Sequence, residues 1–178
     1  MKRFILLLVI VVLAAGCSSF AASKYSIGVD NYSALRRLAG TSLNVGPFTA
    51  TKPGQSEISC RAAGPIKTPD GEPFAEFVRQ ALVDELEFAH LFSATGPVTL
   101  TGNLDRIDFS STSGVWHLGL TVTSSNSRSL TVTADYAYAT SFSGQQACRQ
   151  TAQALMPAVQ HLIGKLVGAP EFPGLATP

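Results

Sequence analysis

Two neighbouring β-strands and the hairpin between them are predicted by residues 115–138, VWHLGLTVTSSNSRSLTVTADYAY. Apolar residues occupy every second position of the first strand: Trp116, Leu118, Leu120 and Val122. The second strand repeats this spacing: Leu130, Val132, Ala134, Tyr136 and Tyr138. Strict alternation is typical of an antiparallel sheet with one buried face and one face toward water. A third strand precedes them from Val98 to Phe109, and its alternation slips by one residue, so a β-bulge is expected near Asp105-Arg106.

Working outward from this three-stranded meander, helical spacing of apolar residues predicts one amphipathic helix over residues 73–92, capped by Asp70, and another over residues 145–167. Pro157 should kink the second helix. Towards the N-terminus we expect a strand at 25–29 and a short helix at 33–39 with Ser33 as its N-cap. Strands at 43–51 and 57–62 should flank a turn at 52–55, with Pro47 at a sheet edge or bulge.

This order of elements predicts an α+β fold of two layers. A largely antiparallel sheet, made of the three-stranded meander plus N-terminal strands, should carry two helices packed on one face. We divide the chain into a signal peptide (1–16), a tether (17–24), a single α+β periplasmic domain (25–167) and a Pro-rich extended tail (168–178).

The N-terminus reads as an export signal. Lys2 and Arg3 precede an uncharged apolar run over residues 4–15. This run is too short to span a bilayer, which takes about 20 such residues. Cleavage would remove two of the 13 basic side chains and leave 11 against 12 acidic ones. That near-neutral balance argues against nucleic acid as a partner.

The residues Ala14-Ala15-Gly16-Cys17 resemble the lipobox of bacterial lipoproteins, with Ala14 where Leu is usual. The resemblance implies that Cys17 is acylated and holds the protein on a membrane. Ser18 and Ser19 follow without an Asp, which by resemblance to sorted lipoproteins favours the periplasmic side of the outer membrane. If the lipobox is not used, ordinary cleavage near Ala15 or Ala22 would give a soluble periplasmic protein.

The order of elements after the lipobox is similar to that of small outer-membrane accessory lipoproteins of the LptE-like and YajG-like families. This resemblance implies a role beside a protein partner of the cell envelope. The basic motif expected after the lipidated Cys in the LptE-like family is replaced here by Cys17-Ser-Ser-Phe-Ala. Only Cys17 is therefore carried over as a functional residue.

Cys60 and Cys148 remain after lipidation, and both fall at apolar positions that face one core. In an oxidising periplasm this favours a disulfide, with two buried reduced thiols as the alternative. A redox role has no Cys-x-x-Cys to support it.

The sequence contains no catalytic set. His90, His117 and His161 lie on separate elements without further ligands at metal-binding spacing, so we expect neither a metal site nor a cofactor. Asp105 and Asp108 would point to opposite faces of their strand unless the bulge realigns them. An envelope hydrolase would need His117 near Asp105 or Asp135 and a nucleophile in a cleft. We expect no enzymatic activity.

Two kinds of binding site remain as hypotheses. The polar face of the meander, with His117 and Thr121, is suited to a protein partner, although Thr also simply favours strands. Alternatively, a pocket between helices and sheet around Trp116, Phe88 and Tyr136 would bind a small ligand or glycan. The strand alternation places Trp116 in the core rather than at a surface. The expected function is thus non-enzymatic binding or stabilisation of a partner in envelope assembly or transport.

Overall fold

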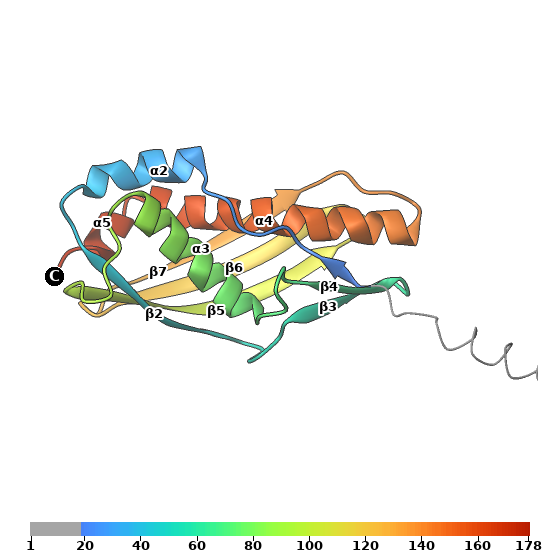
Figure 1. Cartoon of the computed structure of the whole chain (residues 1–178), viewed down its shortest axis with the longest axis horizontal. Helices are drawn as coiled ribbons and strands as arrows, with labels where there is room; N and C mark the ends of the chain where they lie inside the picture. Colours follow the sequence, from blue (N-terminus) through green and yellow to red (C-terminus); the bar gives the residue numbers. More distant parts are fainter. Residues whose placement is uncertain (1–18) are drawn as a thin grey trace, which may run out of the picture.

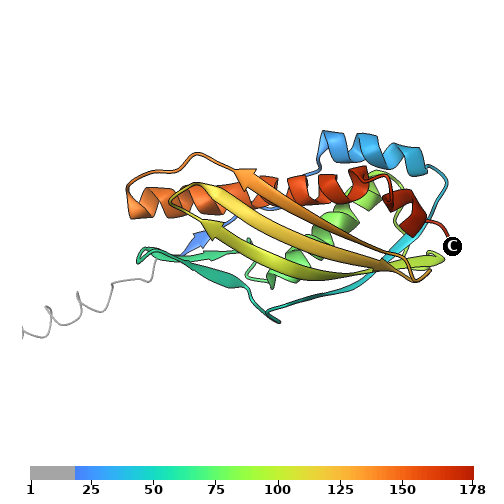
Figure 2. The same ribbon diagram turned by 180° about the vertical axis from the view of Figure 1, so that it is seen from behind.

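A computed structural model describes residues 19–178, so Cys17 and the signal peptide lie outside the described part. The predicted meander is confirmed: β5 (Val98–Ser110), β6 (Val115–Ser124) and β7 (Ser129–Ala137) pair antiparallel in sequence order. Helices α3 (Phe74–Phe88) and α4 (Gly144–Gly168) lie on one side of this sheet (Figure 1). Figure 2 shows the opposite side, with the strands in front of α3. The α+β class and the two-layer arrangement are therefore confirmed.

The fourth strand of this sheet is β2 (Leu43–Ala50), which pairs with β5 in parallel, so the strand order is β2-β5-β6-β7. The expected hairpin around residues 52–55 is wrong, because β3 (Glu57–Cys60) pairs instead with β4 (Gly64–Lys67). The register of β2 shifts between Val45 and Phe48, which places Pro47 in an irregularity on an edge strand, as predicted. The bulge predicted in β5 is also confirmed, between Leu104 and Arg106.

A second, three-stranded sheet has the order β1-β4-β3, where β1 is the dipeptide Phe20–Ala21. Its strand β4 was missed because Gly64-Pro65 resembles a turn. The strand predicted at 57–62 ends at Cys60, since Arg61 adopts a φ of 49° and turns the chain. Ala22 is buried and Phe20–Ala21 form β1, so residues 20–22 of the expected tether at 17–24 belong to the folded domain instead.

The core lies between α3, α4 and the inner face of the sheet. Its fully buried side chains include Trp116, Leu118 and Leu120 of β6, Leu82 and Leu86 of α3, and Leu155 and Leu162 of α4. Helix α3 begins after Pro73, and Asp70 does not cap it. Helix α4 continues through Pro157. None of the helices in the described part of the chain is both long and apolar enough to cross a bilayer.

The chain before β2 differs from prediction. Residues 25–28 form no strand, and α2 spans Val29–Leu35, followed by the 3₁₀ turn η1 (Arg36–Leu38). Ser33 lies inside α2, where its hydroxyl donates a hydrogen bond to the Val29 carbonyl instead of capping the helix. The helix starts early because tertiary contacts hold the preceding residues, as described below for Glu85.

The C-terminal segment is not an extended tail. Residues Phe172–Leu175 form the short helix α5, and Phe172, Leu175 and Ala176 are buried. The Ser124 hydroxyl donates to the Leu175 carbonyl oxygen over 2.8 Å. The prediction was wrong because it gave the three prolines more weight than two large apolar side chains, Phe172 and Leu175. These side chains pack against the end of the sheet.

Candidate interaction surface

The face of the four-stranded sheet opposite the helices is polar throughout. In the described residues no helix covers it (Figure 2). Its side chains come from all four strands and are mostly exposed: Asn44, Thr49, Thr99, Thr101, Asn103, Asp105, Arg106, Asp108, His117, Thr121, Thr123, Thr131, Thr133 and Asp135. We call this set the outer face. It carries three carboxylates against one guanidinium, so its character is polar and weakly acidic.

The bulge in β5 decides where the carboxylates point. Leu104 pairs with Leu120, whereas the next pairs are Arg106 with Gly119 and Asp108 with His117. The extra residue is Asp105, whose carboxylate accepts a hydrogen bond from Thr121 on the outer face. Asp105 and Asp108 therefore share one face, which is the outcome that the sequence allowed only if the bulge realigned them.

A line of hydrogen bonds crosses all four strands of the outer face. The Thr49 hydroxyl donates to the Asn103 amide oxygen over 2.9 Å, and the Asn103 amide donates to Asp105 over 2.6 Å. Thr121 donates to Asp105 over 2.7 Å, and its oxygen lies 2.8 Å from the Thr131 hydroxyl. The predicted binding residue Thr121 thus sits at the centre of a fixed network. Such a network orders polar groups before any partner arrives.

His117 lies on the outer face between two carboxylates. Its Nδ1 is 2.7 Å from Asp135 on β7, and Asp108 is its pairing partner on β5. Asp108 also accepts a 2.7 Å hydrogen bond from Arg106, which raises the pKa of that guanidinium. The histidine–carboxylate pair required by the hydrolase hypothesis therefore forms. The Asp135 side chain is 71% exposed, however, and across residues 19–178 no hydroxyl is hydrogen-bonded to the second ring nitrogen.

Trp116 lies in the core and is fully buried, as its strand position indicated. Its indole N–H donates to the Thr151 carbonyl oxygen of α4 over 2.9 Å, and its ring packs edge to face on Phe109 at 4.8 Å. Tyr136 lies 6.2 Å from the His161 ring, and Phe88 packs on Tyr32 at 5.2 Å. Trp116 and Tyr136 are cross-strand neighbours, whereas Phe88 lines a separate hollow beside Tyr25 and Tyr32, so the structure does not gather the three aromatics around one pocket.

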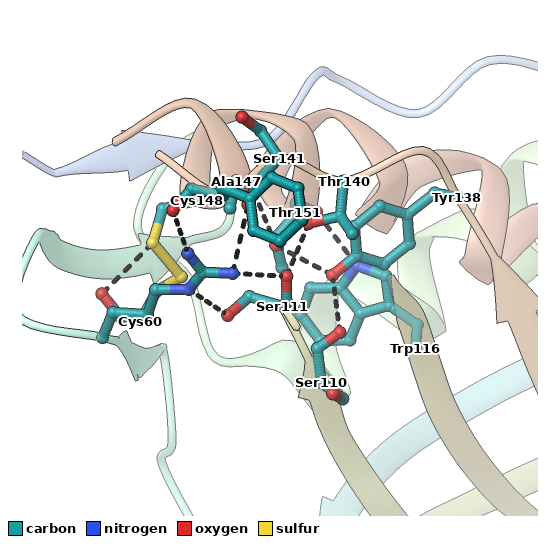
Figure 3. The surroundings of a disulfide bond; sticks show 12 residues. Cys60, Ser110, Ser111, Trp116, Tyr138, Thr140, Ser141, Ala147, Cys148 and Thr151 are labelled. Atoms are coloured by element: carbon teal, nitrogen blue, oxygen red, sulfur yellow. Dashed lines mark hydrogen bonds between the residues drawn. A yellow bond between two sulfur atoms is a disulfide. The ribbon is translucent and has the colours of Figure 1, made fainter. Parts of the chain in front are cut away.

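The predicted disulfide is confirmed: Cys60 and Cys148 are bonded, with 5.8 Å between their Cα atoms (Figure 3). Beside it lies Arg61, which sequence reasoning missed. Its guanidinium donates to the carbonyl oxygens of Ser111, Ser141 and Phe142 over 2.9, 3.3 and 3.2 Å. The disulfide and Arg61 together join the β3–β4 turn, the β5–β6 turn and the loop before α4. We call this region the disulfide corner.

A second missed residue is Glu85, which is fully buried in α3. One of its carboxylate oxygens accepts hydrogen bonds from the Tyr25 hydroxyl (2.6 Å), the Gly28 N–H (2.8 Å) and the Asn31 amide (2.9 Å). Burial, and then the hydrogen bond to Glu85, raise the pKa of Tyr25. The sequence held a signal for this role, because Glu85 falls among the apolar positions of its helix, three residues after Leu82.

The described residues contain no group of three side chains arranged to hold a metal ion.

Neither a search of family models nor a search of curated proteins with this sequence finds a match. Among solved structures, the chain is similar to the crystal structure of protein XCC0632 from Xanthomonas campestris, of the DUF330 family. The TM-score is 0.52 at 13% sequence identity, and the match covers 84% of this chain and 95% of that one. The likeness supports the fold alone.

Proposed function

We propose that this chain is a lipid-anchored protein on the periplasmic side of the outer membrane, without enzymatic activity, that binds or stabilises a protein partner in cell-envelope assembly or transport. The support for the anchor is the signal at residues 1–16 followed by Cys17. The confirmed disulfide agrees with an oxidising compartment.

The observation that carries the partner-binding proposal is the uncovered outer face. Four strands present hydrogen-bonding side chains whose positions are fixed by the network centred on Asp105 and Thr121. A flat, pre-ordered polar surface of this kind suits a protein interface that is rich in hydrogen bonds and bridging water. With three carboxylates and one guanidinium, the matching surface would supply N–H donors and positive charge.

The proposal of a non-enzymatic role draws on the same face. His117 and Asp135 form a pair that could polarise a hydroxyl, but nucleophilic catalysis also needs that hydroxyl within hydrogen-bond reach and a site that excludes water. Neither accompanies the pair in the described residues, and Asp135 is open to solvent.

The test is site-specific photo-crosslinking in the source bacterium. A photoreactive amino acid replaces Thr133, which is exposed on the outer face, or Lys165, which is exposed on α4 in the helical layer. We expect the outer-face position to give one adduct of defined mass and the helical position to give none. A further Thr121→Arg substitution should abolish the adduct while circular dichroism shows that the protein remains folded.

Two results would contradict the proposal. Equal adducts from both positions would mean that the protein has no preferred contact face. An outer-face position without any adduct, in cells where the protein is folded and membrane-associated, would mean that this face is not an interface.

A further inference from the structure

The chain enters the folded domain at the disulfide corner. Strand β1 runs parallel to β4, with Phe20 opposite Ile66, so the N-terminal end of β1 lies towards the Gly64 end of β4. Gly64 in turn pairs with Cys60, which is bonded to Cys148. Figures 1 and 2 agree that β1, the β3–β4 turn and the start of α4 gather at one end of the molecule.

The most exposed large apolar side chain of the described residues lies at this same corner. Phe142 shows 106% of its reference area to solvent, against 55% for Phe88. Its backbone carbonyl accepts a hydrogen bond from Arg61, and the neighbouring Ser141 carbonyl accepts another (Figure 3 labels Ser141 beside the disulfide). The loop is therefore held rigidly while its aromatic ring points away from the protein. A single exposed ring is ordinary on a protein surface, so its meaning depends on what surrounds it.

The segments that form the disulfide corner contain no carboxylate side chain. Residues 19–23, 58–66, 109–116 and 138–150 contain no Asp or Glu, and they carry Arg61 and Arg149. Segments that carry two guanidinium groups and no carboxylate are suited to lie against lipid phosphates. Aromatic side chains at such a position lower the free energy of the system when they enter the region between headgroups and acyl chains.

The short chain between Cys17 and Phe20 indicates that the surface next to the disulfide corner is a membrane. Only Ser18 and Ser19 separate Cys17 from Phe20. A fully extended chain spans at most about 3.6 Å per residue, so the three steps from Cys17 to Phe20 reach roughly 10 Å. If Cys17 is lipidated, the bilayer must lie within that reach of β1, and therefore next to the disulfide corner.

We propose that Phe142 inserts into the lipid surface beside the acylated Cys17, as a second contact that holds the disulfide corner against the bilayer. The proposal rests on the lipidation of Cys17 in the proposed function. Its partner is the phospholipid bilayer itself. The anchor and the Phe142 ring together would fix one end of the molecule on the membrane.

The test uses the full-length lipidated protein with Phe142→Trp in vesicles of phosphatidylcholine, compared with vesicles whose acyl chains are brominated. Bromine quenches indole only at contact. The native Trp116 is buried and provides the background to subtract. We expect Trp at position 142 to lose fluorescence in brominated vesicles and to shift its emission to shorter wavelength. The matched control is Phe88→Trp, because Phe88 ends α3 at the opposite end of the domain and is also exposed.

Flotation of the vesicles separates the two proposals. Lipidated protein that floats with the vesicles but shows no quenching at position 142 would overturn the insertion and leave the anchor standing. Equal quenching at positions 142 and 88 would also overturn it, because the molecule would then have no fixed orientation. Protein that is processed but neither carries lipid nor floats would overturn the anchor, and the insertion with it.

Discussion

At the scale of single residues, Glu85 is the group on which the N-terminal segment depends. Three donors from residues 25–31 converge on one of its oxygens, and in the described part of the chain the second oxygen has no hydrogen-bond partner. A buried carboxylate is costly unless it is hydrogen-bonded, so each of these donors also lowers the cost of burying Glu85. The contact explains why residues 25–28 leave the sheet and α2 starts at Val29.

Removing the Tyr25 hydroxyl should weaken this contact. We expect Tyr25→Phe to lower the free energy of unfolding by about 1–3 kcal/mol at pH 8, because a hydrogen bond to a charged acceptor is lost. Tyr25 has a folded-state pKa above its ordinary value of 10.0, so the unfolded chain ionises first and wild-type stability falls as pH rises past 10. The variant should lack that part of the fall. Urea unfolding between pH 8 and 11 measures both effects. Tyr32→Phe is the control, because its hydroxyl has no hydrogen bond among the described residues, and it should leave the free energy of unfolding at pH 8 unchanged. A variant as stable as the wild type would contradict the role given to this hydroxyl.

At the scale of elements, the two ends of the described chain are tied into the fold by small elements. Strand β1 has two residues and α5 has four, yet β1 completes the second sheet and α5 covers the end of β7 with Phe172 and Leu175. Asn126 in the β6–β7 turn donates to the carbonyl oxygens of Gly174 and Thr177. These contacts turn a Pro-rich segment into part of the core.

Truncating the buried ring of α5 tests this packing. Phe172→Ala should cost about 3–5 kcal/mol in the free energy of unfolding, since it leaves a cavity where a fully buried aromatic ring was. Phe142→Ala is the matched control: the same change at a fully exposed ring should leave stability nearly unchanged. Chemical denaturation of both variants gives the comparison. Equal stabilities would mean that the C-terminal segment behaves as the extended tail predicted for residues 168–178.

At the scale of the whole molecule, the domain is elongated, with the disulfide corner at one end and α5 at the other (Figure 1). The outer face runs along the length between them, on the side away from the helices. If Cys17 carries lipid, a spacer of two residues leaves the domain little freedom relative to the bilayer. The two proposals therefore constrain each other: with the disulfide corner on the membrane, the outer face is held out into the periplasm for a partner.

Lengthening the spacer should release that constraint. Inserting ten Gly and Ser residues between Ser19 and Phe20 makes a flexible coil whose mean span is about 5–6 Å times the square root of its length. We expect flotation with vesicles to persist, because the lipid anchor is unchanged, while quenching of Trp at position 142 declines, since the local concentration of bilayer at the corner falls. A scrambled-order insert of the same composition is the control for sequence effects. Undiminished quenching would show that the short spacer does not hold the corner to the membrane.

The sequence by itself determined the features that depend on local period: the three meander strands, the bulge in β5, the two long helices and the buried side of Trp116. It also placed Cys60 and Cys148 on one core. These follow because strand and helix periods are set by the backbone and can be read within one element.

Only the tertiary structure decided which distant segments meet. It paired β2 in parallel with β5, ordered residues 25–31 around Glu85, buried α5, joined Arg61 to Phe142 and placed Phe88 beside Tyr32, apart from Trp116 and Tyr136. Each of these outcomes depends on groups that are far apart in the chain, and their contact stabilises the fold by more than the local preference that it overrides. Contacts between distant segments leave no repeating pattern within either segment, so the sequence of one segment could not reveal them.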